Sequence, residues 1–450
     1  MKNIFLTTIL SFAVSFAGGG PVSYYGELKV RPNTPFIDGA KTGARAQIRG
    51  VSFGWSNTDW ESERFYNANA VERMAKDWKA EVVRAAYGAT SRVFTDTDAI
   101  ANRNRIETIV DAAIEQDVFV IIDWHSHSAQ NEIRQAKDFF AYMAEKYGEY
   151  DNVIFELYNE PYCKTYRTIT NPDGSTVTTC QEITPWEDIK TYSEEIIPVI
   201  REHSDNLILV GTPNYSQRVE DVIGKKLRDP NLGYVLHFYA ASHNVELWRD
   251  NMNAAINDTM PLFITEYGTT HSDGGCDPVS SYRESDCRVS HYNTHNTERS
   301  EAWHIYMDSR KISSVAWNIN DKYEGSAFFG SVPVLGGKTF DQSVPENWAD
   351  TTKMTASGKY IFKKLNEYYQ CAPWNPESDP SCGGVPVRFS AAFSPEAGAV
   401  IEVFSMQGKK IGELPGDYRN TKALNLKNGV YILLLRQNGA VQTKILRIVK

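Results

Sequence analysis

The sequence lacks several features that mark common classes of protein. Its 450 residues include six cysteines, and no two of them form a CxxC motif of the kind that binds structural zinc. No stretch beyond residue 17 is long and apolar enough to cross a bilayer. No glycine-rich segment joins a strand to a helix in the form that holds a phosphate. We therefore expect no metal, no cofactor and no membrane span.

Positive charge is also scarce over most of the chain. Residues 386–450 hold ten Lys or Arg against four Asp or Glu, whereas the preceding 385 residues hold 37 against 52. An acidic body of this kind does not attract nucleic acid through its electrostatic field. The net charge changes from negative to positive after the proline-rich residues 371–385, which we interpret as a linker.

The first residues have the layout of an export signal. Residues 1–17 combine Lys2, an apolar run and the small-residue ending Ser15-Phe16-Ala17, which is typical of a secretory signal peptide. An exported chain favours disulfides. We expect local pairing because each couple brackets a short loop rich in Pro, Gly, Asp or Ser; the couples are Cys163 with Cys180, Cys276 with Cys287, and Cys371 with Cys382.

Short apolar runs alternate with helical stripes through most of the chain. An example of such a stripe is Val71, Met74, Ala75 and Trp78, spaced at i, i+3, i+4 and i+7. Eight alternations predict an α/β protein with a (β/α)8 TIM barrel. The expected strands lie near residues 49–55, 82–87, 118–125, 153–160, 207–212, 233–239, 261–266 and 312–319.

Beyond the linker the period changes to that of strands, at residues 400–404, 429–435 and 443–449. We therefore expect a small basic all-β, sandwich-like domain at the end of the chain. The expected organisation is a signal peptide over residues 1–17, a barrel over 18–370, a linker over 371–385 and the terminal domain over 386–450.

Polar and aromatic residues stand at the ends of the expected barrel strands. Parallel barrels gather such residues at one face. Each one alone has an ordinary structural explanation as an ion-pair partner, a core histidine or a packing residue, but together they indicate one pocket. They are Arg84, His125, Asn159, Glu160, His237, Tyr239, Glu266 and Trp317.

Two of these residues are glutamates, and glycoside hydrolysis requires a pair of carboxyl groups on either side of the bond that breaks. A retaining reaction needs one carboxylate that attacks the anomeric carbon and one acid that protonates the leaving group. Asn159 suits a hydrogen bond to a sugar 2-hydroxyl, and Tyr239 suits the attacking carboxylate. Arg84 and the histidines would fix charge and proton positions.

These motifs resemble glycoside hydrolase family 5 over roughly residues 45–370. The amino-acid sequence of residues 121–125 and 317–324 is similar to that of the bacterial endo-β-1,4-glucanase branch. The resemblance implies that Glu160 is the acid/base and Glu266 the nucleophile. It also implies substrate contacts from Trp317, Lys322, Glu324, Trp55 and Tyr87.

The leading hypothesis is a secreted or cell-surface retaining endoglucanase that acts as a monomer on cellulose and related β-glucans. A mannanase, a xyloglucanase and a catalytically silent glycan-binding barrel remain alternatives. The basic tail resembles C-terminal sorting domains of secreted bacterial proteins, and it has no tryptophan for a carbohydrate-binding face. The pairs His125/His127 and His291/His295 have metal-like spacing but no third ligand.

Overall fold

The computed structural model of the chain describes residues 19–58, 62–89, 96–170, 176–274, 294–322, 324–329, 348–378, 400–405, 410–415, 429–437 and 440–448. The chain divides into two compact units, Met1–Tyr368 and Tyr369–Lys450. The expected signal peptide, residues 1–17, lies outside the described residues. Among the helices of the described ranges, none is both long and apolar enough to cross a membrane.

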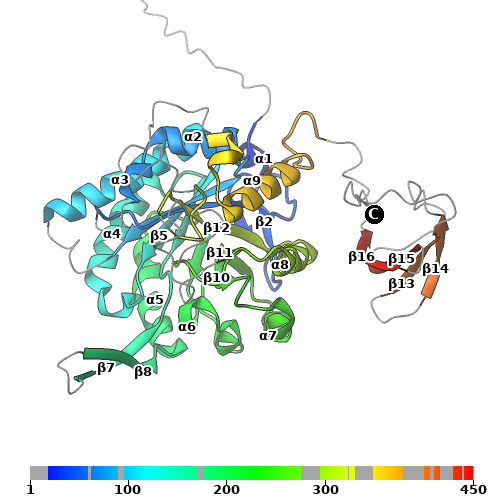
Figure 1. The fold of residues 1–450 in the computed structure, drawn as a ribbon. Helices are drawn as coiled ribbons and strands as arrows, with labels where there is room; N and C mark the ends of the chain where they lie inside the picture. The colour runs from blue at the N-terminus through cyan, green and yellow to red at the C-terminus, as the bar shows by residue number, and fades with distance from the viewer. Residues whose placement is uncertain are drawn as a thin grey trace, which may run out of the picture. The chain divides into compact units, whose positions relative to one another are not determined.

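A closed barrel of eight parallel strands forms the centre of the first unit (Figure 1). The order around the barrel is β3, β4, β5, β6, β9, β10, β11 and β12, and β12 closes on β3. The predicted (β/α)8 fold is therefore confirmed. The strands are β3 (Arg49–Phe53), β4 (Val82–Gly88), β5 (Phe119–His125), β6 (Val153–Glu156), β9 (Ile208–Val210), β10 (Leu232–Tyr239), β11 (Leu262–Gly268) and β12 (Ser313–Ile319).

Helices cover the outside of the barrel (Figure 1). Side-chain caps fix where several of them begin: Asn67 accepts from the N–H of Ala70 at the start of α2, and Asn296 accepts from that of Arg299 at the start of α8. The helices are α2 (Ala68–Lys76), α3 (Asp96–Glu115), α4 (Ile133–Tyr147), α5 (Trp186–Arg201), α6 (Pro213–Ser216), α7 (Val245–Asn257), α8 (Thr297–Arg310) and α9 (Ala356–Tyr369).

Two regions differ from the expectation. The sequence of residues 219–227 favours a short helix after the fifth barrel strand, but the structure has only a 3-10 turn there, η4 (Val219–Val222). Residues 21–45, which appear turn-rich in the sequence, contain a short helix and two paired strands. Strands of three residues are too short to show a hydrophobic period, which explains the omission. The elements are α1 (Pro21–Tyr25), β1 (Leu28–Val30) and β2 (Ile37–Gly39).

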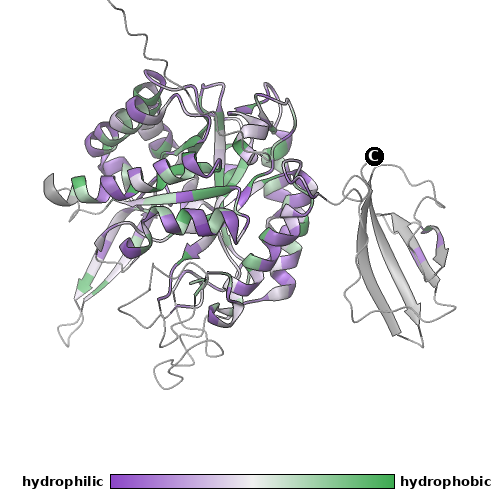
Figure 2. Cartoon of the chain, turned by 90° about the horizontal axis from the view of Figure 1, so that it is seen from above, coloured by the Kyte–Doolittle hydropathy of each residue, from purple (hydrophilic) through white to green (hydrophobic). Residues whose placement is uncertain are grey.

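Alternation along each strand separates the barrel interior from the layer beneath the helices. In β4, Ala85 and Tyr87 join the large apolar core between strands and helices, whereas Ala86 belongs to a separate inner cluster. Arg84 shares the inward side with Ala86. Figure 2 shows hydrophobic residues along the central strands and polar residues on the outer helix faces. Burial of this layer is the main stabilising contribution.

A two-stranded hairpin that the sequence did not reveal leaves the barrel after β6 (Figure 1). Its strands are β7 (Cys163–Thr170) and β8 (Thr176–Ile183), and almost all their side chains are exposed. Exposed strands rich in threonine have no apolar alternation, so the period gives no signal.

The hairpin contains one of the three expected disulfides. Cys163 and Cys180 are bonded, with their Cα atoms 5.7 Å apart. Cys371 is also disulfide-bonded. Cys276, Cys287 and Cys382 lie outside the described residues, so the other two expected pairings remain predictions.

The second unit contains an antiparallel sheet with the strand order β14, β13, β15, β16. The sequence predicted three of these strands and missed β14, a short segment that contains glycine and ends at proline. The expected boundaries at residues 371–385 remain a prediction. The strands are β13 (Val400–Ser405), β14 (Lys410–Pro415), β15 (Gly429–Gln437) and β16 (Ala440–Ile448).

Candidate active site

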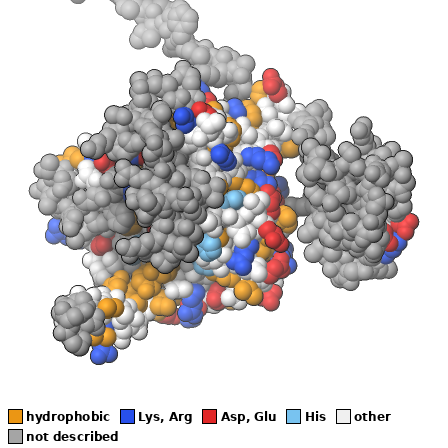
Figure 3. All heavy atoms as spheres, in the orientation of Figure 1, with side chains coloured by type: hydrophobic (Ala, Val, Ile, Leu, Met, Phe, Trp, Pro, Cys, Tyr) orange, Lys and Arg blue, Asp and Glu red, His pale blue; other side chains and the backbone are white. Residues whose placement is uncertain are grey.

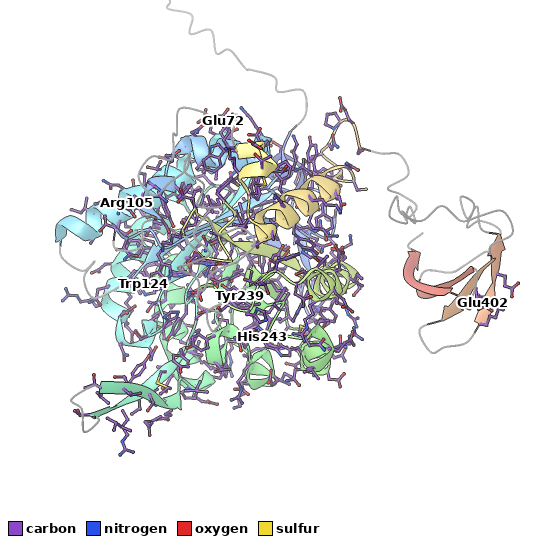
Figure 4. All side chains as sticks on the ribbon, in the orientation of Figure 1. Glu72, Arg105, Trp124, Tyr239, His243 and Glu402 are labelled. Atoms are coloured by element: carbon purple, nitrogen blue, oxygen red, sulfur yellow. A yellow bond between two sulfur atoms is a disulfide. The ribbon has the colours of Figure 1, made fainter. Side chains whose placement is uncertain are left out.

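The residues expected at strand ends meet at the carboxyl-terminal mouth of the barrel. All strands of the barrel run parallel, so their last residues share one face. Figure 4 labels Tyr239 over the centre of the barrel. The strands supply Arg84 from β4, His125 from β5, His237 and Tyr239 from β10, Glu266 from β11 and Trp317 from β12.

Asn159 and Glu160 do not lie on a strand, contrary to the prediction of a strand that reaches Glu160. β6 ends at Glu156. Beyond it the backbone N–H groups of Asn159 and Glu160 donate to the carbonyls of Trp124 and Ser126, each at 3.2 Å. The segment therefore leaves the sheet pattern and is fixed against the end of β5.

The two glutamates are close together, and both side chains are largely buried. A carboxylate oxygen of Glu160, one of Glu266 and a ring nitrogen of His237 lie within 4.8 Å of one another. The side chains of Glu160 and Glu266 are only 13% and 6% exposed. Two buried carboxylates at this distance repel, so the pair titrates as a unit.

Glu266 is oriented through both of its oxygens. The hydroxyl of Tyr239 donates to Oε1 at 2.7 Å, and the guanidinium of Arg84 donates to Oε2 at 3.2 Å. Both contacts favour the ionised carboxylate. Tyr239 and Arg84 thus hold Glu266 in one orientation and supply positive potential beside it.

Arg84 is the centre of a buried charge cluster. Its guanidinium contacts Glu156 at 2.7 Å, Asp123 at 3.0 Å and the side-chain oxygen of Asn159 at 2.6 Å. Burial raises the pKa of Asp123 and of Glu156 to about 7, although the charge of Arg84 opposes this rise. One cation thus faces several acids that take up protons near neutral pH.

Glu160 contacts two histidines. Its Oε2 lies 3.2 Å from Nε2 of His127, and its Oε1 lies 3.0 Å from Nδ1 of His237. The other ring nitrogen of His237 lies 2.8 Å from the hydroxyl of Thr265, which donates to Glu156 at 2.7 Å. Because the hydroxyl hydrogen of Thr265 is already used, Nε2 of His237 must be the donor to its oxygen.

The charge of His237 decides where the proton of the pair lies. Burial acts to raise the pKa of Glu160, but its hydrogen bonds with His127 and His237 outweigh burial and hold the pKa below its usual range. Burial and the negative charge of an ionised Glu160 raise the pKa of Glu266 well above its usual range. Glu266 is therefore a free carboxylate when the proton of the pair lies on Glu160, which removes that negative charge. Burial also lowers the pKa of His237, and the neutral ring offers Nδ1 as an acceptor for a proton on Glu160.

An aromatic wall lines another side of the mouth. The ring of Trp317 stacks on that of His125 with a centroid distance of 5.3 Å, and Trp55 meets His125 edge-on at 4.4 Å. Nδ1 of His125 lies 2.6 Å from Asp123. The peptide bond between Trp317 and Asn318 is cis. Trp55, Trp317 and Tyr239 form one inner cluster.

Tyr87 does not belong to this pocket, so its expected substrate contact is wrong. It follows Ala86 in β4 and therefore points to the helix side of the sheet. There its ring stacks on Trp124 at 5.2 Å and packs on Phe139 at 4.4 Å, and it is only 4% exposed. Figure 4 labels Trp124 away from Tyr239, toward the helices.

Lys322 and Glu324 lie on the loop after β12. The amide of Asn318 donates to Glu324 at 3.2 Å, and the backbone N–H of Lys322 donates to the side chain of Asn320. Burial raises the pKa of Glu324 to about 7, against the charge of Lys322. The first bond ties the loop to Asn318, the residue that follows Trp317, and the second holds Lys322 against Asn320.

Sequence reasoning missed the residues that hold the catalytic candidates. Asp123, Glu156 and Thr265 precede the expected residues by two, four and one positions. Only Asp123 lies at an even separation from its neighbour, His125, on the same strand, which is a possible signal. Tyr215 was missed because it follows β9 in an irregular segment. Its ring meets His127 edge-on at 6.1 Å.

The donor chemistry of the cluster fits a proton-transfer site better than a metal site. Glu160, His237 and Glu266 have metal-compatible spacing. The guanidinium of Arg84 already supplies positive charge 3.2 Å from Glu266, which opposes a cation there. His125 and His127 contact different carboxylates, and His291 lies outside the described residues.

Comparison with known proteins places this geometry in context. A family model described as cellulase, glycosyl hydrolase family 5, matches residues 39–323. Endoglucanase Z of Dickeya dadantii is 37% identical over 313 residues, which are 69% of this chain and 61% of that protein. An endoglucanase of Clostridium saccharobutylicum is 31% identical over 365 residues, covering 80% of this chain and 69% of that one. This chain thus spans less than two thirds of Endoglucanase Z.

Solved structures give the same picture of the fold. The catalytic domain of Thermobifida fusca endoglucanase Cel5A has 25% identity and a TM-score of 0.60, covering 77% of this chain and all of that domain. A structure from Cytophaga hutchinsonii has 31% identity and a TM-score of 0.60, covering 77% and 96%.

Proposed function

Because the chain belongs to the cellulase family of glycosyl hydrolases, family 5, we propose that it is a retaining endo-β-1,4-glucanase that cleaves internal bonds of cellulose and related β-glucans. The observation that carries this proposal is the approach of Glu160 and Glu266 to within 4.8 Å. Retaining enzymes separate their carboxyl groups by about 5–5.5 Å, whereas inverting enzymes leave about 6.5–9.5 Å for a water molecule.

In the first step the carboxylate of Glu266 attacks the anomeric carbon while Glu160 gives its proton to the glycosidic oxygen. Tyr239 and Arg84 hold Glu266 for this attack. A neutral His237 accepts a hydrogen bond from protonated Glu160, which keeps the acid in position. The products are a glycosyl ester on Glu266 and a released alcohol.

In the second step Glu160, now a carboxylate, removes a proton from water as the oxygen attacks the same carbon from the side that the leaving group left. Glu266 is released, and Glu160 regains its proton. The protons balance over the cycle without a cofactor.

The sugar would be positioned by groups around the pair. The Nδ2 of Asn159 is buried and donates to no acceptor among the described residues, which suits a sugar 2-hydroxyl. Trp55 and Trp317 offer aromatic faces to the apolar faces of sugar rings. Lys322 and Glu324, on the adjoining loop, would contribute hydrogen bonds.

The substrate is tested by reducing-sugar release from carboxymethylcellulose, lichenan, xyloglucan, glucomannan and galactomannan. We expect the highest turnover on carboxymethylcellulose or lichenan. Equal or faster turnover of mannan would make the chain a mannanase, and preference for xyloglucan would make it a xyloglucanase. No release from any of them would favour a glycan-binding barrel.

Alanine variants of the two glutamates should lose activity in different ways. Glu266→Ala removes the nucleophile and should stop turnover of every substrate. Glu160→Ala should still glycosylate Glu266 from dinitrophenyl glycosides, whose leaving groups need no proton, and azide should then release a β-glycosyl azide. NMR of the first product of the unchanged protein should show the β-anomer. An α-anomer would show that the enzyme inverts rather than retains. Azide rescue of Glu266→Ala that yields a β-azide would show that the roles of Glu160 and Glu266 are exchanged.

We also propose that the protein is exported, on the composition of residues 1–17. The mature protein recovered outside the cell should begin near residue 18. Amino-terminal sequencing that finds Met1 on the extracellular protein would contradict cleavage.

A further inference from the structure

The hairpin of β7 and β8 contributes nothing to the barrel core, yet it begins three residues after Glu160. Its strands pair over their whole length, and the Cys163–Cys180 disulfide joins them near the barrel. In Figure 3 hydrophobic side chains gather where the hairpin leaves the barrel. A covalently fixed, exposed projection beside the proposed acid requires an explanation.

The two faces of the hairpin differ in chemistry. The register pairs Tyr166 with Cys180, and successive residues alternate between faces. The tyrosine–threonine face therefore carries Tyr166 and a double row of threonines, Thr168, Thr170, Thr176 and Thr178. The hydroxyls of Thr168 and Thr178 lie 2.9 Å apart, as this assignment requires. The opposite face carries Arg167, Ile169, Val177 and Thr179.

A half-exposed aromatic ring beside a row of hydroxyls suits a sugar chain. Tyr166 is 52% exposed. Its ring offers an apolar surface to the flat face of a sugar, and threonine hydroxyls both donate and accept hydrogen bonds. A partner protein would instead require a larger, more continuous apolar surface.

A stacked pair of tyrosine rings lies between the base of the hairpin and the site. Tyr162 stacks on Tyr215 with a centroid distance of 4.1 Å and an angle of 17°, and Tyr215 adjoins His127, which contacts Glu160. The backbone N–H of Thr184, just after β8, donates to the carbonyl of Tyr162. Burial, followed by the proximity of Tyr162, raises the pKa of Tyr166, consistent with neighbouring rings.

The contacts of Glu160 give the direction of this path. Its partner His127 adjoins Tyr215, and Cys163 at the base of the hairpin follows Glu160 by three residues. A chain on the leaving-group side of Glu160 therefore extends toward Tyr215 and the hairpin. Glu160, which protonates the departing oxygen, is on the hairpin side.

We propose that the tyrosine–threonine face binds glucosyl units of the departing chain, beyond the sugars held at the barrel mouth. This inference rests on the proposed function. The hairpin then lengthens the leaving-group side of the cleft and favours long substrates over short ones.

The test compares Tyr166→Ala with Ile169→Ala, a matched control on the opposite face with 44% exposure. The quantity measured is the ratio of kcat/KM for a long cello-oligosaccharide to kcat/KM for an aryl cellobioside, which has no sugar on the leaving side. We expect Tyr166→Ala to lower this ratio about fivefold, the effect of losing one aromatic contact. Ile169→Ala and Tyr166→Phe should leave the ratio within about twofold of the unchanged protein.

The outcomes separate the two proposals. Equal ratios for Tyr166→Ala and Ile169→Ala, in protein that still cleaves β-1,4-glucan, would overturn the hairpin proposal alone. An unchanged protein that cleaves no β-1,4-glucan of any length would overturn the proposed function. Thermal unfolding of each variant shows that it is folded, since both side chains lie on the exposed hairpin.

Discussion

Thr265 sits between the proposed acid and the buried charge cluster, one residue before Glu266. Its hydroxyl accepts from His237 and donates to Glu156, so it fixes which nitrogen of His237 carries the proton. The acceptor nitrogen is then the one that faces Glu160. The hydroxyl of Thr265 thus selects the tautomer of His237 that lets Glu160 keep its proton.

Thr265→Val keeps the shape of the side chain and removes the hydroxyl. We expect kcat to fall about tenfold, which corresponds to about 1.4 kcal/mol for one hydrogen bond, while KM changes little. Because protonated His237 lowers the pKa of Glu160, the pH profile of kcat/KM should also shift. Thr265→Ser restores the hydroxyl and should restore both values. A lower melting temperature with an unchanged pH profile would indicate a merely structural role.

Site residues at strand ends could be predicted from the sequence because the last side chains of parallel strands lie together at the carboxyl-terminal mouth of the barrel. Arg84, His237 and Glu266 were found in this way. Tyr87 was misplaced because neighbouring residues of a strand face opposite sides, and proximity to Arg84 in sequence says nothing about parity. Glu156 was missed because a buried acid is recognisable only from its partner, which here stands 72 residues away.

Among the elements, the turn of α6 has an unusual backbone. Asn214, Tyr215 and Ser216 all have positive φ angles, between 55° and 59°. Each such residue other than glycine costs roughly 1 kcal/mol. The cost is offset by contacts with the Glu160 segment: the N–H of Tyr215 donates to the carbonyl of Pro161, and the hydroxyl of Ser216 donates to that of Asn159 at 2.8 Å.

Ser216→Ala removes this buried hydroxyl while the backbone strain remains. We expect the free energy of unfolding to fall by about 1–2 kcal/mol, measured by urea denaturation. Asn214→Gly is the control, since glycine adopts positive φ readily and should leave stability unchanged or raise it by up to about 1 kcal/mol. A Ser216→Ala protein as stable as the original would show that other contacts hold the turn.

The elements with strong hydrophobic periods were predictable, and the others were not. The barrel strands and helices such as α4 carry apolar residues at regular spacing because they pack against each other in the core between the sheet and the helices. The hairpin of β7 and β8 faces solvent and shows no period, and the strands of three residues near the amino terminus are too short for one. Glu160 was expected on a strand because the apolar residues before it gave no sign that β6 ends at Glu156.

For the whole molecule, we propose that the basic carboxyl-terminal region serves export or surface attachment rather than hydrolysis. The division of the chain near Tyr369 supports independent units. A chain that ends just after Cys382 should keep its specific activity on soluble glucan and its melting temperature, and should lose its normal location in the native host. Loss of most activity on soluble glucan would contradict this separation.

Closure of the barrel joins distant parts of the chain. The N–H of Ile48 donates to the hydroxyl of Ser313, 265 residues later, and β3 pairs with β12. At a synthesis rate of about 5–20 residues per second, β3 waits roughly 10–50 s for its last partner. During that interval the sheet has two open edges and cannot complete its fold. The late position of β12 therefore sets the time during which the growing chain cannot yet close its barrel.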